Sequence, residues 1–250
     1  MSPTDPAPTL AFPDVQRPDA GTALISAWLV PDTRFQRPAA DAVWDAWEAQ
    51  PRPAAMLALT TFLSTDGGHV LTYAQWTDDA AHQEWVRTRR PAALAPIDAA
   101  LPGIRRPGLT RYRHHRSHVA AERATRTPEF VVTPAFATAT VDAQHALADT
   151  VLRMLAEEPV PGLLGAHLHL SRDGRRVLNF GEWRDRSAWR AFADSAAPAR
   201  LRTAIEALPG VAPAPAVPAD GASAGTSGVP AVPAYVPHRS LVNVPPPGRG

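Results

Sequence analysis

An asparagine and a tryptophan stand four residues apart in the run from Leu170 to Trp183 (LSRDGRRVLNFGEW). The side-chain amide of Asn179 and the indole N–H of Trp183 can each donate a hydrogen bond to a developing oxyanion. On a strand, residues four apart lie on the same face. The pair therefore indicates either a ligand-facing polar spot or a buried amide that a nearby backbone group satisfies.

The run that holds this pair occurs twice in the chain. Residues 163–183 align without a gap with residues 56–76, at an offset of 107 residues. The two runs share Leu-Ser-x-Asp-Gly-x-x-Val-Leu and a closing Trp, and a later Leu-Pro-Gly recurs at the same offset. Because Asp-Gly between alternating apolar residues is a turn signal, each run predicts a β-hairpin. The duplication predicts two units of similar fold.

Composition narrows the class of protein. The 250 residues carry a net charge of +1 and contain no cysteine. A nearly neutral chain lacks the basic footprint of a nucleic-acid-binding protein, and a chain without cysteine has neither disulfides nor thiolate metal sites. No apolar run has membrane-spanning length, and the first residues do not resemble a signal peptide. We expect a cytoplasmic protein without nucleic-acid or membrane partners.

The order of elements in each copy predicts the fold class. Each copy shows a strand, a helix, a hairpin, a helical region and a last strand. These lie at 22–30, 38–49, 56–76, 78–97 and 109–117 in the first copy, and at 130–139, 141–158, 163–183, 185–208 and 235–242 in the second. This order is typical of the ferredoxin-like α+β arrangement. We expect two tandem ferredoxin-like domains, whose antiparallel four-stranded sheets pack face to face as a pseudo-dimeric α+β barrel.

The remaining segments set the domain boundaries. We predict a flexible N-terminal arm at 1–20, a first repeat at 21–118, a linker at 119–128, a second repeat at 129–243 and a tail at 244–250. Residues 211–229 are rich in Pro, Ala, Gly and Ser and have no counterpart in the first copy. They predict a disordered insertion within the second repeat.

The register of the second hairpin sorts its side chains by face. If Asp173 and Gly174 form the turn, Leu168 lies opposite Asn179, and both share a face with Trp183. This face is otherwise apolar, so it is expected to pack against the helices.

The other face of this hairpin carries two histidines and a carboxylate. His167, His169 and Glu182 resemble part of a metal site, but no further ligand is evident. Because this face is expected to meet the other repeat, we favour a polar interface and predict no metal.

In both repeats, roughly 22–117 and 130–240, the sequence resembles the antibiotic biosynthesis monooxygenases of the dimeric α+β barrel superfamily. The resemblance is clearest between Leu170 and Trp183. It implies that an anthrone-type or phenolic polycycle is oxidised by O₂ without metal, flavin or haem. It also implies that Asn179, Trp183 and an arginine of the following helix are the catalytic residues. The first copy has Thr72 in place of Asn179 and alanines in place of the arginines, so we expect it to be degenerate.

These inferences yield a set of candidate residues. The predicted catalytic residues are Asn179, Trp183 and Arg202. The predicted substrate-binding residues are Arg200, Trp189, Phe192, Met154 and Leu168. The expected partners are an aromatic polyketide and O₂, with an internal pseudo-dimer that can pair further as a homodimer.

Two alternative functions remain open at this point. A haem-binding or haem-degrading relative needs an axial histidine on a helix that faces the pocket, and the helices of the second repeat offer only His145. A non-catalytic or cyclase-like polyketide-binding protein is the other alternative. A pocket filled by Trp189 and Phe192 would favour a structural role, whereas an open cavity next to Asn179 would favour a ligand.

Overall fold

The computed structural model describes residues 12–215 and 232–242. Its strands are β1 (Thr22–Leu29), β2 (Met56–Ser64), β3 (His69–Trp76), β4 (Leu109–Val119), β5 (Phe130–Val132), β6 (Ala135–Thr138), β7 (Leu163–Ser171), β8 (Arg176–Trp183), β9 (Val211–Ala214) and β10 (Ala234–Val242). Its α-helices are α1 (Gln36–Glu48), α2 (Asp79–Thr88), α3 (Arg90–Ala100), α4 (Val141–Glu157), α5 (Arg186–Ala193) and α6 (Ala197–Glu206). Two short 3-10 helices are η1 (Thr33–Phe35) and η2 (Ala121–Ala124).

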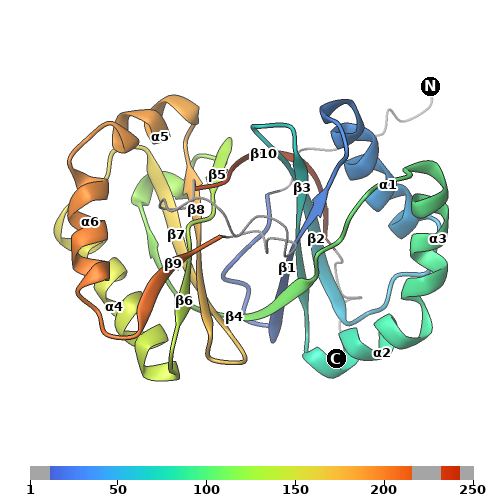
Figure 1. Ribbon diagram of the computed structural model, residues 1–250, viewed down its shortest axis with the longest axis horizontal. Coiled ribbons are helices and arrows are strands. Elements are labelled where there is room, and N and C mark those ends of the chain that lie inside the picture. Colours follow the sequence, from blue (N-terminus) through green and yellow to red (C-terminus); the bar gives the residue numbers. More distant parts are fainter. Residues whose placement is uncertain (1–11, 216–231, 243–250) are drawn as a thin grey trace.

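The strands form one antiparallel sheet that closes on itself. The strand order is β5-β10-β2-β3-β1-β4-β7-β8-β6-β9, and an additional β5–β8 pairing closes the ring. Helices α1, α2 and α3 cover one side of this barrel, and α4, α5 and α6 cover the opposite side (Figure 1). The fold is therefore of the ferredoxin-like α+β kind that the element order predicts.

The expectation of two separate four-stranded sheets is wrong, because strands cross between the two halves. β4 pairs with β1 and then runs on along β7, with Val119 opposite Gly165. In the same way β10 pairs with β5 and then with β2, with Leu241 opposite Leu59. The backbone groups at the edge of each half are thus satisfied by the other half.

The predicted register of the second hairpin is confirmed. Leu170 lies opposite Val177, and Leu168 lies opposite Asn179. The turn residue Gly174 has a φ of +77°, a left-handed conformation that glycine adopts without a steric penalty.

The closed sheet separates two kinds of core. On the outer faces, one cluster packs β1 to β3 against α1 and α3, and a second packs β7 and β8 against α4 to α6. A third cluster fills the interior of the barrel and includes Phe62, Tyr73 and Phe180, each fully buried. Alternate residues of β8 therefore serve different cores, as the period of a strand requires.

Residues 12–20 differ from the flexible arm expected at 1–20. Phe12 packs against the rings of Phe62 and Phe180 in the barrel interior, with centroid distances of 5.9 and 6.3 Å. Val15 is 3% exposed. Apolar side chains hold this segment to the barrel, while residues 1–11 lie outside the described residues.

The insertion expected at 211–229 and the strand expected at 130–139 also differ. Residues Val211–Ala214 form β9 and pair with β6, because the edge of β6 is free to accept another strand. Residues 216–231 lie outside the described part of the chain. The expected strand is split into β5 and β6 at Thr133 and Pro134, where proline has no N–H to donate.

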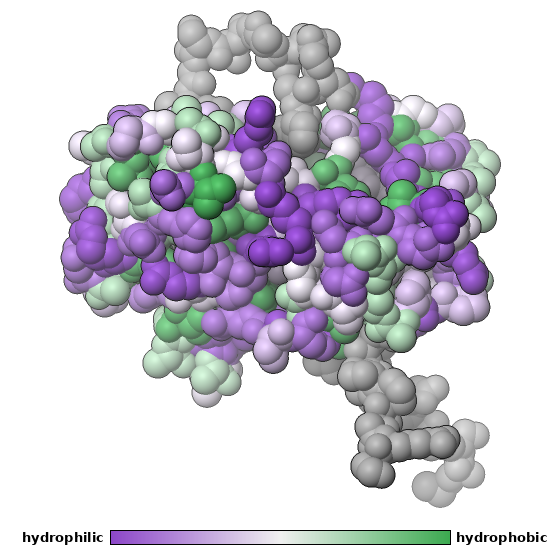
Figure 2. All heavy atoms as spheres, turned by 90° about the horizontal axis from the view of Figure 1, so that it is seen from below, coloured by the Kyte–Doolittle hydropathy of each residue, from purple (hydrophilic) through white to green (hydrophobic). Residues whose placement is uncertain are grey.

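The surface view from below shows mostly hydrophilic residues with small hydrophobic patches between them (Figure 2). None of the helices within residues 12–215 is long and apolar enough to cross a membrane.

Candidate functional site

A cavity of about 260 Å³ lies between the outer face of β8 and the helices α4 to α6. Its walls are mostly apolar, and its polar side chains are few. The sheet contributes Asn179 and Trp183 to the lining, and α6 contributes Arg202 and Glu206. An apolar hollow with a small number of convergent polar groups is the usual form of a small-molecule site.

The side chains of Asn179 and Trp183 have unused hydrogen-bonding atoms in this cavity. Asn179 Oδ1 and Trp183 Nε1 are buried and have no hydrogen-bond partner among the described residues. The backbone N–H of Asn179 donates to the carbonyl oxygen of Pro134 at 3.0 Å, so the side chain is not needed there. An unpaired buried polar group costs about 1–3 kcal/mol. Asn179 Oδ1 therefore lacks the backbone partner that a purely structural amide would have, and this favours a ligand-facing role.

Aromatic rings form one wall of the cavity. The ring centroids of Trp189 and Phe192 each lie 5.2 Å from that of Trp183. Leu168 lines the cavity from β7, directly opposite Asn179 in the sheet. These three predicted substrate-binding residues therefore reach the cavity, and they leave space in it. Flat aromatic walls favour a planar, apolar ligand.

Arg202 and Glu206 lie one turn apart on α6 and line the same cavity. Both are exposed, and neither forms an ion pair within residues 12–215 and 232–242. The helix thus places a free positive and a free negative charge at the edge of an apolar space. Sequence reasoning selected Arg202 and missed Glu206.

Two predicted substrate-binding residues lie outside this cavity. The Arg200 guanidinium is 2.6 Å from a carboxylate oxygen of Glu158, and both residues line a neighbouring hollow between α4 and α6. Met154 lines that same hollow. On α4, the next residue, Leu155, faces the cavity instead.

The position of Leu155 follows from a one-residue difference between the repeats. Gln36 of α1 and Gln144 of α4 make equivalent bonds, since each amide donates to a serine carbonyl, Ser64 in one half and Ser171 in the other. This pairing gives the first helices an offset of 108 residues, whereas the hairpins have 107. One residue turns a helix by about 100°. If the hairpin offset of 107 is applied to Trp47, it points to Met154, whereas the helix offset of 108 points to Leu155.

The equivalent space in the first half is filled. Trp47, at the position of Leu155, stacks on Trp85 with a centroid distance of 4.8 Å and packs against Trp76 at 6.3 Å. The hydroxyl of Thr72, at the position of Asn179, lies 2.7 Å from that of Ser26. The remaining hollow measures about 100 Å³. The first half therefore has neither the space nor the free polar atoms of the second.

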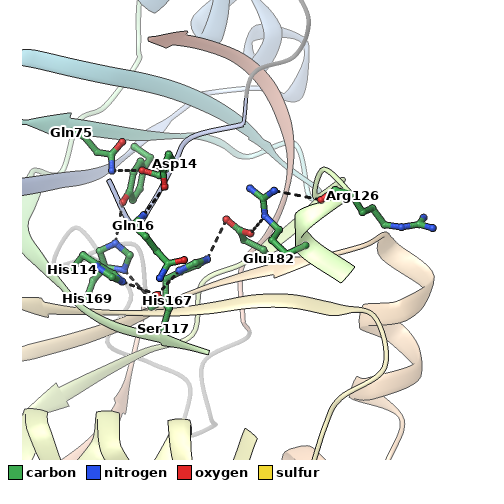
Figure 3. Close-up of polar contacts among 11 residues, drawn as sticks. Asp14, Gln16, Gln75, His114, Ser117, Arg126, His167, His169 and Glu182 are labelled. Atoms are coloured by element: carbon green, nitrogen blue, oxygen red, sulfur yellow. Dashed lines mark hydrogen bonds and ion pairs between the residues drawn. The ribbon is translucent and has the colours of Figure 1, made fainter. Parts of the chain in front are cut away.

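A separate chain of polar contacts runs through the barrel interior (Figure 3). His114 Nε2 and His167 Nδ1 each lie 2.7 Å from the hydroxyl oxygen of Ser117. His167 Nε2 is 3.2 Å from Glu182, whose other oxygen accepts a 2.6 Å bond from Arg123. Because Glu182 and its neighbours on β8 alternate in direction, this network lies behind the cavity wall.

His169 occupies the same interior and joins the two halves. Its Nδ1 donates to the carbonyl of His167 at 3.0 Å, so Nε2 accepts from the Tyr73 hydroxyl at 3.1 Å. Burial lowers the pKa of His169, and together with the nearby His114 and His167 it brings this pKa to about 3. These contacts form a polar interface between the halves. No group of three or more possible metal ligands occurs among the described residues.

The closed sheet, the outer helices and the lined cavity define an α+β barrel with an apolar, ligand-sized site beside Asn179 and Trp183. Residues 130–203 match the sequence model of a family described as antibiotic biosynthesis monooxygenase. This segment, which carries the cavity residues of β8 and α5, is similar to that family.

Solved structures share the whole fold. An anthrone oxidase-like protein is 14% identical, with a TM-score of 0.63 over 88% of this chain and 92% of that chain. A putative monooxygenase from Fusobacterium nucleatum subsp. nucleatum is 7% identical, with a TM-score of 0.56 over 89% and 95%. One from Lactobacillus acidophilus NCFM is 6% identical, with a TM-score of 0.52 over 88% and 96%. At these identities the likeness is one of fold. No curated protein sequence matches the chain.

Proposed function

We propose that the second half of this protein is a monooxygenase that oxidises a polycyclic phenol or anthrone with O₂, without a bound cofactor. The observation that carries this proposal is the pair of unpaired polar atoms, Asn179 Oδ1 and Trp183 Nε1, in an apolar and aromatic cavity. The family of residues 130–203 supports the reaction class. The anthrone oxidase-like structure supports the type of substrate.

The chemistry requires little beyond binding and charge stabilisation. An electron-rich phenolate or carbanion can reduce O₂ itself, so the protein must favour the deprotonated substrate and keep it out of water. The Trp183 indole N–H and the Nδ2–H group of Asn179 donate to the oxygen on which negative charge develops, while the unpaired Asn179 Oδ1 can only accept a hydrogen bond, for example from a substrate hydroxyl. The aromatic wall formed by Trp183, Trp189 and Phe192 holds the ring system in place.

Arg202 adds a positive charge at the helix side of the cavity. A cation within hydrogen-bonding range of the substrate lowers the pKa of a phenol or an acidic carbon by about 1–3 units. Because Arg202 has no ion-pair partner among the described residues, its charge is available to the ligand. Arg200, which pairs with Glu158, is not.

The same geometry weighs against the alternatives. His145, the one histidine on the helices of the second half, is exposed and packs against His115 outside the cavity, with ring centroids 4.9 Å apart. No histidine is found among the described residues that line the cavity, so haem would lack an axial ligand there. The open space beside Asn179 favours a ligand over a purely structural role.

We further propose that the two halves are an internal pseudo-dimer in which only the second half works. Trp47 and Trp85 occupy the site of the first half. The first half then serves to close the sheet, through β2 and β4. A further homodimer is not needed to complete the site.

Oxygen consumption with a model anthrone, in metal-free and flavin-free buffer, tests the proposal. The wild type should consume O₂ faster than the spontaneous rate. Asn179→Ala and Trp183→Phe should each reduce turnover at least tenfold, which corresponds to about 1.4 kcal/mol of barrier. Spontaneous rates alone, across several polycyclic phenols, would instead favour a binding or cyclase-like role.

A further inference from the structure

The proposed oxidation releases protons from the substrate, and the cavity offers few groups that can accept them. Among the described lining residues there is no histidine, aspartate, tyrosine or lysine. The Asn179 amide oxygen is not basic, and the Pro134 carbonyl already accepts the backbone N–H of Asn179. Glu206 is the one carboxylate of the lining within this part of the chain.

We infer that Glu206 is the general base of the proposed reaction and later returns its proton to the peroxide. This inference rests on the proposed function and adds a residue to it. The carboxylate is unpaired and exposed on α6, whereas Asn179 and Trp183 belong to β8 on the sheet side. The oxyanion donors and the base thus lie on different walls of the cavity.

This arrangement suits a substrate whose oxygen and reactive carbon are at opposite positions of one ring. In an anthrone the carbonyl oxygen and the methylene carbon lie across the central ring. With the oxygen held by Asn179 and Trp183, the methylene is directed away from the sheet and toward the helices. Glu206, next to the positive charge of Arg202, is then in place to take the proton.

The atoms and electrons of the reaction balance with O₂ as the oxidant. Glu206 removes one methylene proton, and the resulting carbanion gives electrons to O₂ as a C–O bond forms. The terminal peroxide oxygen receives that proton from Glu206. Glu206 then removes the second proton, the O–O bond breaks, and the departing hydroxide takes this proton to give water. The net change converts CH₂ and O₂ into C=O and H₂O.

The first half has a carboxylate at the equivalent position, but that carboxylate is paired. The buried residues Ile97 of α3 and Ile205 of α6 match at an offset of 108, so Glu206 corresponds to Asp98 and Arg202 to Leu94. Asp98 forms an ion pair with Arg106 at 2.5 Å, whereas Glu206 forms none within residues 12–215 and 232–242. Helix α6 packs against α4, α5 and β9, and the cavity side chains from these elements are apolar. Arg202 is thus the charged group that faces the same space as Glu206.

The test compares wild type with Glu206→Gln and Glu206→Asp across pH, using anthrone turnover. We expect Glu206→Gln to reduce kcat at least about 100-fold and to abolish the acid limb of the pH profile, because amides do not accept protons. Glu206→Asp should keep the limb with a reduced kcat. Glu157→Gln, which removes an exposed carboxylate on α4 paired with Arg153, should behave as wild type.

A second measurement needs no turnover. The phenol 1-hydroxyanthraquinone absorbs at different wavelengths when neutral and ionised, so its pKa can be read while it is bound. The negative charge of Glu206 should raise that pKa, and Glu206→Gln should lower it by about 1. Equal values in the two proteins, or an unchanged acid limb in Glu206→Gln, would overturn the role of Glu206. Tight binding with this shift but no anthrone oxidation would overturn the proposed reaction alone.

Discussion

Leu155 occupies on α4 the position that Trp47 occupies on α1. The buried residues of the two helices match at an offset of 108, and Gln36 and Gln144 fix that offset through equivalent bonds. The indole of Trp47 fills the first half, and the smaller side chain of Leu155 leaves about 260 Å³ open in the second. One position on the first helix of each repeat therefore contributes to the difference between a core and a cavity.

Leu155→Trp should close the cavity. An indole at this position has room to enter, so the free energy of unfolding should change by no more than about 1–3 kcal/mol, the usual range for overpacking. Affinity for a polycyclic phenol should fall at least tenfold, as measured by fluorescence titration. The reciprocal Trp47→Leu should lose about 2 kcal/mol of stability and leave binding unchanged. Equal binding by Leu155→Trp and wild type would contradict this assignment.

The substitution Asn179→Thr gives the second half the residue that the first half has at the equivalent position, Thr72. The protein should stay folded, because Thr72 is accommodated at the equivalent position of β3. Anthrone oxidation should fall at least tenfold in kcat/KM, because the amide donor is lost. Thr72→Asn is the matched control and should have no effect on turnover. A fully active Asn179→Thr variant would show that the amide does not contact the substrate.

Arg123→Ala should destabilise the barrel interior. Glu182 is 1% exposed, and its carboxylate lies 2.6 Å from the Arg123 guanidinium. Removal of the guanidinium leaves a buried carboxylate without its cation, which costs about 3 kcal/mol. Urea denaturation measures this loss. Adding Glu182→Gln to the variant should recover part of it, and a double variant no more stable than Arg123→Ala would argue against charge as the cause.

Stability should decrease on mild acidification. Burial lowers the pKa of His82 and of His114 to about 4, and that of His169 to about 3. The unfolded chain has histidine pKa values near 6.5, so it binds more protons than the folded chain below that pH. The free energy of unfolding is therefore highest above pH 6.5 and falls as the pH drops toward 4.

Denaturant titrations at pH 7.5 and pH 5 check this dependence. His169, which is fully buried, should account for about 2 kcal/mol of the difference between the two conditions. In His169→Phe that share should disappear, whatever the variant does to stability at pH 7.5. A wild type that is equally stable at both values would contradict a neutral buried His169.

Periodicity and turn chemistry predicted much of the fold. The Asp-Gly turn set the hairpin register, and with it the side of the sheet on which Asn179 lies. The strand period likewise separated Trp183 from Glu182. What the sequence did not reveal was the closure of the sheet, because the pairing of β4 with β7 and of β10 with β2 depends on contacts far apart along the chain.

The sequence predicted the site residues on strands more accurately than the site residues on helices. A one-residue shift in strand register moves a side chain to the opposite face of the sheet. The repeated Asp-Gly turn fixed this register. On a helix the same shift turns a side chain by about 100°, which separates Met154 from Leu155. Glu206 carries no distinctive sequence signal, because glutamate is common on the exposed surface of any helix.

The crossing of β10 to β2 also governs how this chain can fold during synthesis. Thr60 of β2 and Ser240 of β10 form a hydrogen bond across 180 residues of sequence. Until residues 234–242 emerge from the ribosome, β2 presents the open edge of an otherwise apolar strand, and such edges promote aggregation. A truncated product that ends before β10 would therefore be a target for chaperones, even though the cavity residues of β8 and α6 are all present in it.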